Sequence, residues 1–169
     1  PDIMTWLSCA SAVTLIEEMY AVVFPLYASK IAEKLIVDKL LNPFREEFSS
    51  PKSDYHSRFN HILNYIHGNG HAPSLGEFVH FLRAIQRPFK SSEEVIITKF
   101  RNFLKNLPWE GKSLLRNKTF ISRLSKLAGL RSGGAHIKDG NLNKVLEIQS
   151  ILIEEGKPGP LLRAFGYNF

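Results

Sequence analysis

The sequence is almost free of cysteine, since Cys9 is the only one among its 169 residues. A single cysteine cannot close a disulfide within the chain, which excludes the disulfide-stabilised scaffolds of small secreted domains. We therefore expect a protein of a reducing compartment, the cytoplasm.

Long apolar runs are also lacking. The longest stretch, around Ala10–Tyr27, is interrupted by Glu17, Glu18 and Pro25, whereas a membrane-spanning helix needs about 20 consecutive apolar residues. The stretch has no basic leading segment of the kind that precedes a secretory signal. We expect no membrane partner. Because the first residue is Pro1 and not Met, we expect a fragment or a processed product of a larger protein.

Sustained alternation of apolar and polar residues, the pattern of half-buried strands, is absent, so we expect no sheet. Glycine-rich phosphate loops of the Walker or dinucleotide type are absent as well. What is present is a globular composition, with 44% apolar and 22% charged residues. The length suits one domain over 1–169, ending in an apolar tail, 156–169.

Apolar residues recur at helical spacing along most of the chain. The clearest case is Leu75, Phe78, Val79, Leu82 and Ile85. Two capping boxes, Ser74 with Glu77 and Ser91 with Glu94, mark helix starts. Pro25 is expected at the start of a helix and Pro43 at an end or kink. The predicted helices span 2–23, 26–41, 54–67, 75–87, 95–107, 112–128 and 142–155. The fold class is therefore an all-α helical bundle of about five to seven helices.

The charge favours partners that carry phosphate. The formal net charge is +6, and an excess of Lys and Arg promotes binding to nucleic acid through counterion release. A run of basic residues precedes the segment Leu130–Ile137: Lys112, Arg116, Lys118, Arg123 and Lys126. Such a run is usually a solvated helix face, but beside a phosphate site it would guide RNA in.

The segment Leu130–Ile137 holds an arginine and a histidine, Arg131 and His136, separated by small residues that include two glycines. Five helical residues rise about 7.5 Å, and the glycines allow a bend that brings the pair closer. Arginine grips a phosphate with two donors, and histidine moves a proton near neutral pH. This pair can cleave RNA without a metal: the 2′-hydroxyl attacks the phosphate, His136 moves the proton and Arg131 stabilises the developing charge.

The spacing of this pair resembles the Arg-x4–6-His signature of the HEPN superfamily, which lies at the start of a late helix in a four- or five-helix bundle. Other segments resemble parts of that family more weakly: Phe120–Leu127, Leu142–Ile153, Pro25–Leu35 and Ser74–Phe78. The resemblance implies a HEPN-like fold and a metal-independent endoribonuclease without cofactors, acting as a homodimer. It also implies a role in prokaryotic toxin–antitoxin or antiviral systems, with a regulatory or antitoxin protein as a possible partner.

Two further residues enter through the resemblance. Ser132 follows the arginine where active members most often carry Asn, Asp or His, so the chain is either active with a supporting serine or a non-catalytic module that dimerises or binds a partner protein. Glu33 matches the family's acidic position, where it would orient Arg131, and an ordinary solvated glutamate is the equal alternative.

The remaining histidines form a weaker candidate. His56, His61, His67 and His71 cluster in one predicted helix and its exit loop, and the last two have a spacing that can ligate zinc. Gly68 and Gly70 interrupt that spacing and no His-Glu-x-x-His pattern occurs. We therefore expect solvated or capping histidines and no metal. A simple nucleic-acid-binding domain is a third possible function.

Overall fold

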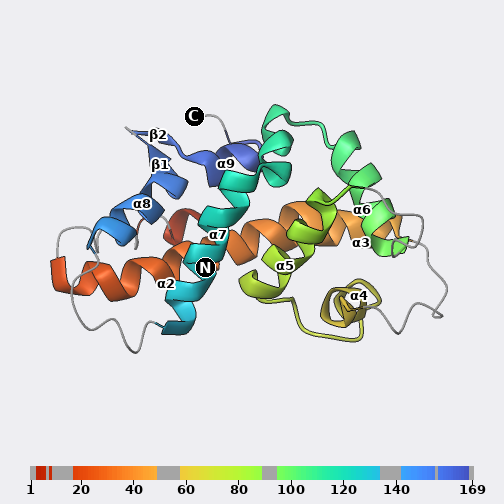
Figure 1. Ribbon diagram of the computed structural model, residues 1–169, viewed down its shortest axis with the longest axis horizontal. Helices are drawn as coiled ribbons and strands as arrows, with labels where there is room; N and C mark the ends of the chain where they lie inside the picture. Colours follow the sequence, from red (N-terminus) through yellow and green to blue (C-terminus); the bar gives the residue numbers. More distant parts are fainter. Residues whose placement is uncertain are drawn as a thin grey trace.

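The computed structural model describes residues 3–6, 8, 17–48, 58–88, 95–133, 142–154 and 156–167. Over these residues the chain is helical apart from loops and one short hairpin, which confirms the predicted all-α fold. Figure 1 shows the arrangement: α2 and α3 run along the long axis, and α5 and α7 cross in front of them.

The first part of the bundle is one long helical stretch. It consists of α2 (Glu17–Ile36), the π-helix η1 (Val37–Leu41) and α3 (Asn42–Glu47). Pro25 lies inside α2, so the expectation that a helix begins there was wrong. Its neighbours Phe24 and Ala28 are buried, and this packing offsets the hydrogen bond that a proline inside a helix removes.

Pro43 lies in the first turn of α3, directly after η1. There the N–H of Asn42 bonds to the carbonyl of Val37, five residues back. Such a widened turn is one of the recognised ways in which a helix passes an insertion or a bend. The helical course therefore continues past a proline that was expected to end or kink it.

The second part contains α4 (Asn60–Ile66), α5 (Leu75–Gln86) and α6 (Val95–Asn106). The capping box at Ser74 is confirmed: its Oγ accepts from the N–H of Glu77, and the Glu77 carboxylate accepts from the N–H of Ser74. The capping box predicted at Ser91 and Glu94 lies outside the described residues.

The predicted helix 112–128 is two elements. A 3-10 helix, η3 (Glu110–Arg116), ends at Asn117, and α7 (Lys118–Gly133) follows. The side chain of Asn117 accepts a hydrogen bond from the N–H of Phe120 at 3.1 Å, which caps the start of α7 and separates the two helices.

The last helix is shorter than predicted and a small sheet follows it. Helix α8 (Leu142–Leu152) gives way to β1 (Ile153–Glu154) and β2 (Lys157–Pro158), which pair antiparallel with Ile153 opposite Pro158. Gly156 turns between them with a φ of 76°, a value that favours glycine. The expectations of a helix to residue 155 and of no sheet were therefore wrong.

Helix α9 (Pro160–Ala164) docks the apolar tail on the body. Leu161, Leu162 and Phe165 are buried, and α9 packs on η3 and α8. The indole N–H of Trp109 donates to the carbonyl of Ala164 at 2.7 Å.

Phenylalanine rings fill the centre of the bundle. Phe44 meets Phe100 edge-on, with ring centroids 4.8 Å apart, and Phe100 contacts Phe81 at 5.0 Å. These rings come from α3, α5 and α6. Helix α5 also packs on α7, so its buried face joins the two halves of the bundle and fixes the position of its exposed face.

Candidate functional site

The predicted Arg-His pair lies at the end of α7. The helix continues to Gly133, so Arg131 and Ser132 occupy its last turn and no bend occurs before the first glycine of the motif. The side chains of these residues and the whole of His136 lie outside the described part of the chain. The structure thus places the backbone of Arg131 but does not place the pair.

Helices α5 and α7 run antiparallel. Arg83 Nη2 donates to Ser125 Oγ at 2.8 Å, and, one turn further along α5, Gln86 Nε2 donates to the carbonyl of Arg116 at 2.8 Å. The first turn of α5 and the last turn of α7, which carries Arg131, therefore lie toward the same end of the molecule (Figure 1).

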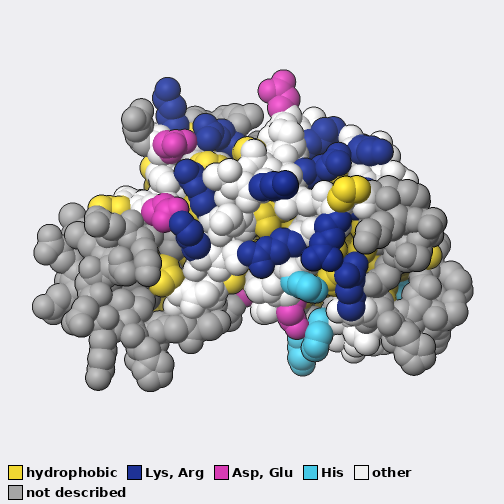
Figure 2. Space-filling model, viewed as in Figure 1, with side chains coloured by type: hydrophobic (Ala, Val, Ile, Leu, Met, Phe, Trp, Pro, Cys, Tyr) yellow, Lys and Arg dark blue, Asp and Glu magenta, His cyan; other side chains and the backbone are white. Residues whose placement is uncertain are grey.

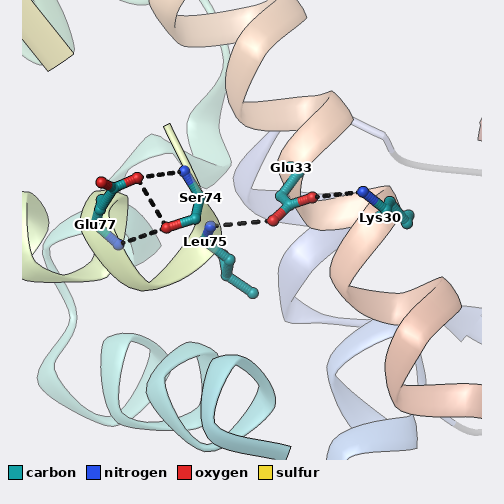
Figure 3. Close-up of polar contacts among 5 residues, drawn as sticks. All are labelled: Lys30, Glu33, Ser74, Leu75 and Glu77. Carbon is teal, nitrogen blue, oxygen red and sulfur yellow. Dashed lines mark hydrogen bonds and ion pairs between the residues drawn. The ribbon is translucent and has the colours of Figure 1, made fainter. Parts of the chain in front are cut away.

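Glu33 lies at this end and joins α2 to α5. Its Oε1 accepts from the backbone N–H of Leu75 at 3.2 Å, and its Oε2 lies 3.3 Å from Lys30 Nζ (Figure 3). The side chain is 16% exposed. Glu33 is therefore largely buried and bound to the first turn of α5, where a carboxylate is favoured by the unpaired N–H groups and the helix dipole.

Glu77 completes the polar cluster at the start of α5. Its Oε2 is 2.8 Å from Ser74 Oγ and 2.7 Å from the Ser74 nitrogen (Figure 3), while its Oε1 is 3.4 Å from His61 Nδ1. Two carboxylates, from α2 and from α5 itself, thus occupy the N-terminal turn of one helix.

The five predicted RNA-binding residues do not share one environment. Lys112 lies on η3, not on α7, and its ammonium donates to the carbonyls of Lys105 at 2.7 Å and Leu107 at 2.5 Å, which caps the end of α6. Arg116 and Lys118 are exposed and Arg123 is half-buried. The residues lie close in sequence, but only some present their charge to solvent.

Lys126 pairs with Glu147 across α7 and α8, with its ammonium 2.6 and 2.9 Å from the two carboxylate oxygens. The hydrogen bond from Lys126 lowers the pKa of Glu147 below its usual value, with smaller contributions from the charges of Lys126 and Arg123. This lysine therefore links two helices rather than standing alone on the surface.

Three exposed residues that no sequence motif assigned to a site lie along α5 and at its C-terminal cap. His80 and Arg83 are three residues apart and exposed, so they lie side by side opposite the apolar stripe, and the exposed Arg87 follows as the C-cap residue; we call these three residues the basic stripe of α5. Figure 2 shows Lys and Arg side chains gathered over α5, η3 and α7, with histidines beside them near α4. The helical spacing of His80 and Arg83 could have revealed this stripe, but no sequence motif marks it.

Two pockets flank the His61–Glu77 pair. The larger, about 630 Å³, lies between α2, α4 and the loop before α5, and its polar lining includes Lys30, Glu33 and His71. The smaller, about 260 Å³, lies between α4 and α5; we call it the α4–α5 pocket. Within the described residues no group of three or more His, Cys, Asp or Glu is placed to hold a metal ion; His56 lies outside them.

The sequence matches no model of a protein family, no curated protein and no solved structure. None of the helices in the described part of the chain combines the length and the apolar character needed to cross a bilayer.

Proposed function

We propose that this chain is a metal-independent endoribonuclease in which Arg131 binds the scissile phosphate and His136 transfers the proton of the attacking 2′-hydroxyl. Attack of that oxygen on phosphorus expels the 5′-oxygen of the next nucleotide, which takes up a proton to become a 5′-hydroxyl, and leaves a 2′,3′-cyclic phosphate. The arginine stabilises the charge that gathers on the phosphoryl oxygens. The observation that carries the proposal is the Arg-x4-His spacing at the end of a helix in an all-α chain.

The charge around the motif supports this function. From Gly111 to Lys138 the sequence holds no Asp or Glu, and its basic residues are Lys112, Arg116, Lys118, Arg123, Lys126, Arg131 and Lys138. A segment of one sign attracts a polyanion and raises its local concentration. The exposed members of this run and the stripe on α5 would lead an RNA strand toward the end of α7.

We further propose a homodimer, because one arginine and one histidine supply few groups for phosphoryl transfer and a two-fold axis doubles them. Ser132 would support the phosphate contact by a hydrogen bond, and Glu33, which bonds to the first turn of α5, would approach the pair and orient Arg131. By the resemblance to HEPN proteins, the setting would be the cytoplasm of a prokaryote, with a toxin or antiviral role and a regulatory partner.

The test is cleavage of a labelled RNA by the wild-type chain and by His136→Ala. We expect the substitution to slow cleavage by about 100-fold or more, the usual contribution of general acid–base catalysis. His71→Ala, which removes an exposed histidine far from the motif in sequence, is the matched control and should cleave normally. EDTA should not stop the reaction, and the products should carry cyclic phosphate ends.

Equal cleavage by wild type and His136→Ala would contradict the assignment. Ser132, at a position where active HEPN proteins most often carry Asn, Asp or His, favours one second candidate: a non-catalytic module that dimerises or binds a partner protein. That candidate predicts no His136-dependent cleavage and unchanged dimerisation in the variant.

A further inference from the structure

The α4–α5 pocket has the size and lining of a site for one planar group. Its volume is about 260 Å³, just below the roughly 300 Å³ at which pockets begin to hold drug-sized ligands. It combines an apolar floor with a few polar side chains at the rim, which is the usual composition of a small-ligand site. The pocket is lined by Arg58 and Phe59 just before α4, by His61 and Ile62 on α4, and by Gly76, Glu77 and His80 on α5.

Three planar groups lie together in this pocket. Phe59 is only 3% exposed; the Arg58 guanidinium lies 4.9 Å from the centre of its ring, and the His80 ring lies 5.4 Å away. Histidine rings and arginine guanidinium planes are the surfaces on which proteins stack unpaired bases. Because Phe59 and Ile62 close the floor, a ligand would gain apolar contact as well as stacking.

The rim adds hydrogen-bonding groups and an open entrance. Glu77 presents a carboxylate, an acceptor for the exocyclic amine of a base, and His61 stands beside it at 3.4 Å. Gly76 lines the pocket without a side chain, and a Cβ built there would meet no atom within 4 Å. The space over Gly76 is therefore free for a ligand.

The pocket adjoins the basic stripe of α5 through His80. His80, which lines the pocket, is followed one turn later by Arg83 and then by Arg87, both exposed. Arg83 uses Nη2 for Ser125, which leaves other donors of its guanidinium for a phosphate. A base held by the pocket would thus carry its flanking phosphates along α5.

We infer that the α4–α5 pocket binds one unstacked base of a single-stranded RNA, while Arg83 and Arg87 contact the adjoining phosphates. This inference rests on the proposed nuclease function and identifies its substrate class as single-stranded. The pocket lies near the first turn of α5, which points toward the same end of the molecule as the turn of α7 that carries Arg131. The pocket would therefore set the register of the strand relative to the cleavage motif.

The test is binding of a fluorescent single-stranded RNA to the full chain carrying His136→Ala, which prevents cleavage. Gly76→Leu places a large side chain in the pocket at a position where a Cβ meets no atom within 4 Å, and Gly76→Ala adds only a methyl at the same place. We expect Gly76→Leu to weaken binding by roughly 5- to 150-fold, the value of one base stack, and Gly76→Ala to weaken it less. His80→Ala should weaken binding in the same direction.

Binding of double-stranded RNA distinguishes the contribution of the pocket to RNA affinity from that of the phosphate contacts. Paired bases cannot enter, so Gly76→Leu should bind duplex as well as its parent, whereas Arg83→Gln should weaken both forms and reduce the salt dependence. Circular dichroism should show that Gly76→Leu and Gly76→Ala are both folded. Equal binding of single-stranded RNA by the two variants would overturn the proposed base-binding role of the pocket. A parent chain that binds no RNA would overturn it as well. Cleavage is measured separately with the chain that retains His136. The nuclease proposal and the pocket proposal can therefore fail independently.

Discussion

Basic side chains of the same sequence run have different roles in the structure. The ammonium of Lys112 holds the end of α6, and that of Lys126 holds Glu147 on α8. Lys118, in the same run, is exposed. A count of charges along the sequence therefore overstates the surface available to RNA, because part of that charge is used to stabilise helix ends and helix contacts.

The ion pair of Lys126 and Glu147 leads us to predict how the stability of the protein changes at acid pH. A carboxyl whose pKa is lowered in the folded state contributes stability above its ordinary value of 4.5, and that contribution is lost as the pH falls through the lowered pKa. In Lys126→Met the pKa of Glu147 should rise back toward its ordinary value, and the acid sensitivity that the pair confers should disappear. NMR titration of the Glu147 carboxyl carbon measures the pKa directly.

The matched control is Lys118→Met, the same substitution eight residues earlier on the helix. At about 12 Å along α7 its charge is screened at physiological salt, so the pKa of Glu147 should stay low. A pKa that is unchanged in Lys126→Met would show that the ion pair does not form in solution.

At the scale of elements, the short helix α9 is held on η3 by a close approach of two backbones. A Cβ built on Gly111 would lie 1.7 Å from the carbonyl oxygen of Arg163, which no side chain can tolerate. The indole of Trp109, next to η3, donates to the carbonyl of the following residue, Ala164. Glycine is therefore required at this position for the tail to dock.

We predict that Gly111→Ala loosens or displaces α9 and lowers the free energy of unfolding by about 1–3 kcal/mol or more, the usual cost of overpacking. Chemical denaturation measures the loss, and the fluorescence of Trp109 should report the changed surroundings. Gly76→Ala is the control. A Cβ built there meets no atom within 4 Å and alanine is the better helix former, so the free energy of unfolding should not fall. A Gly111→Ala chain as stable as wild type would contradict the contact.

In the whole molecule, the surface over α5 and α7, which pack antiparallel, also carries many of the exposed basic side chains. The antiparallel packing of α5 and α7 brings the start of one helix and the end of the other to the same side of the bundle (Figure 1), and Lys and Arg side chains gather over α5, η3 and α7 (Figure 2). In the proposed function, an RNA strand would lie across these side chains toward the turn of α7 that carries Arg131.

The proposed homodimer gives a prediction at this scale. Sedimentation equilibrium should show a species of twice the 19.2 kDa chain mass, and the cleavage rate per chain should fall once dilution separates the subunits. The expected reason is that a two-fold axis assembles both Arg-His pairs. A chain that cleaves RNA at the same specific rate while remaining monomeric would rule out a shared site.

Local signals in the sequence predicted the individual helices well where packing agreed with them. The capping box at Ser74 and the all-α class are confirmed, because each follows from hydrogen bonds and spacing within a few residues. Pro25 misled the prediction, since burial of its neighbours sustains a helix through it. Asn117 was missed as a cap, although its residue type and position just before Lys118 could have revealed it.

Helical spacing, capping residues and net charge are local properties of the chain, so the sequence alone determined an all-α, basic protein with an Arg-x4-His segment late in its length. Contacts between distant residues were decided only by tertiary packing. Glu33 reaches the N–H of Leu75, 42 residues away, and Phe59 meets His80 across two helices. Such contacts depend on how buried faces fit together, and no spacing along the chain encodes that fit directly.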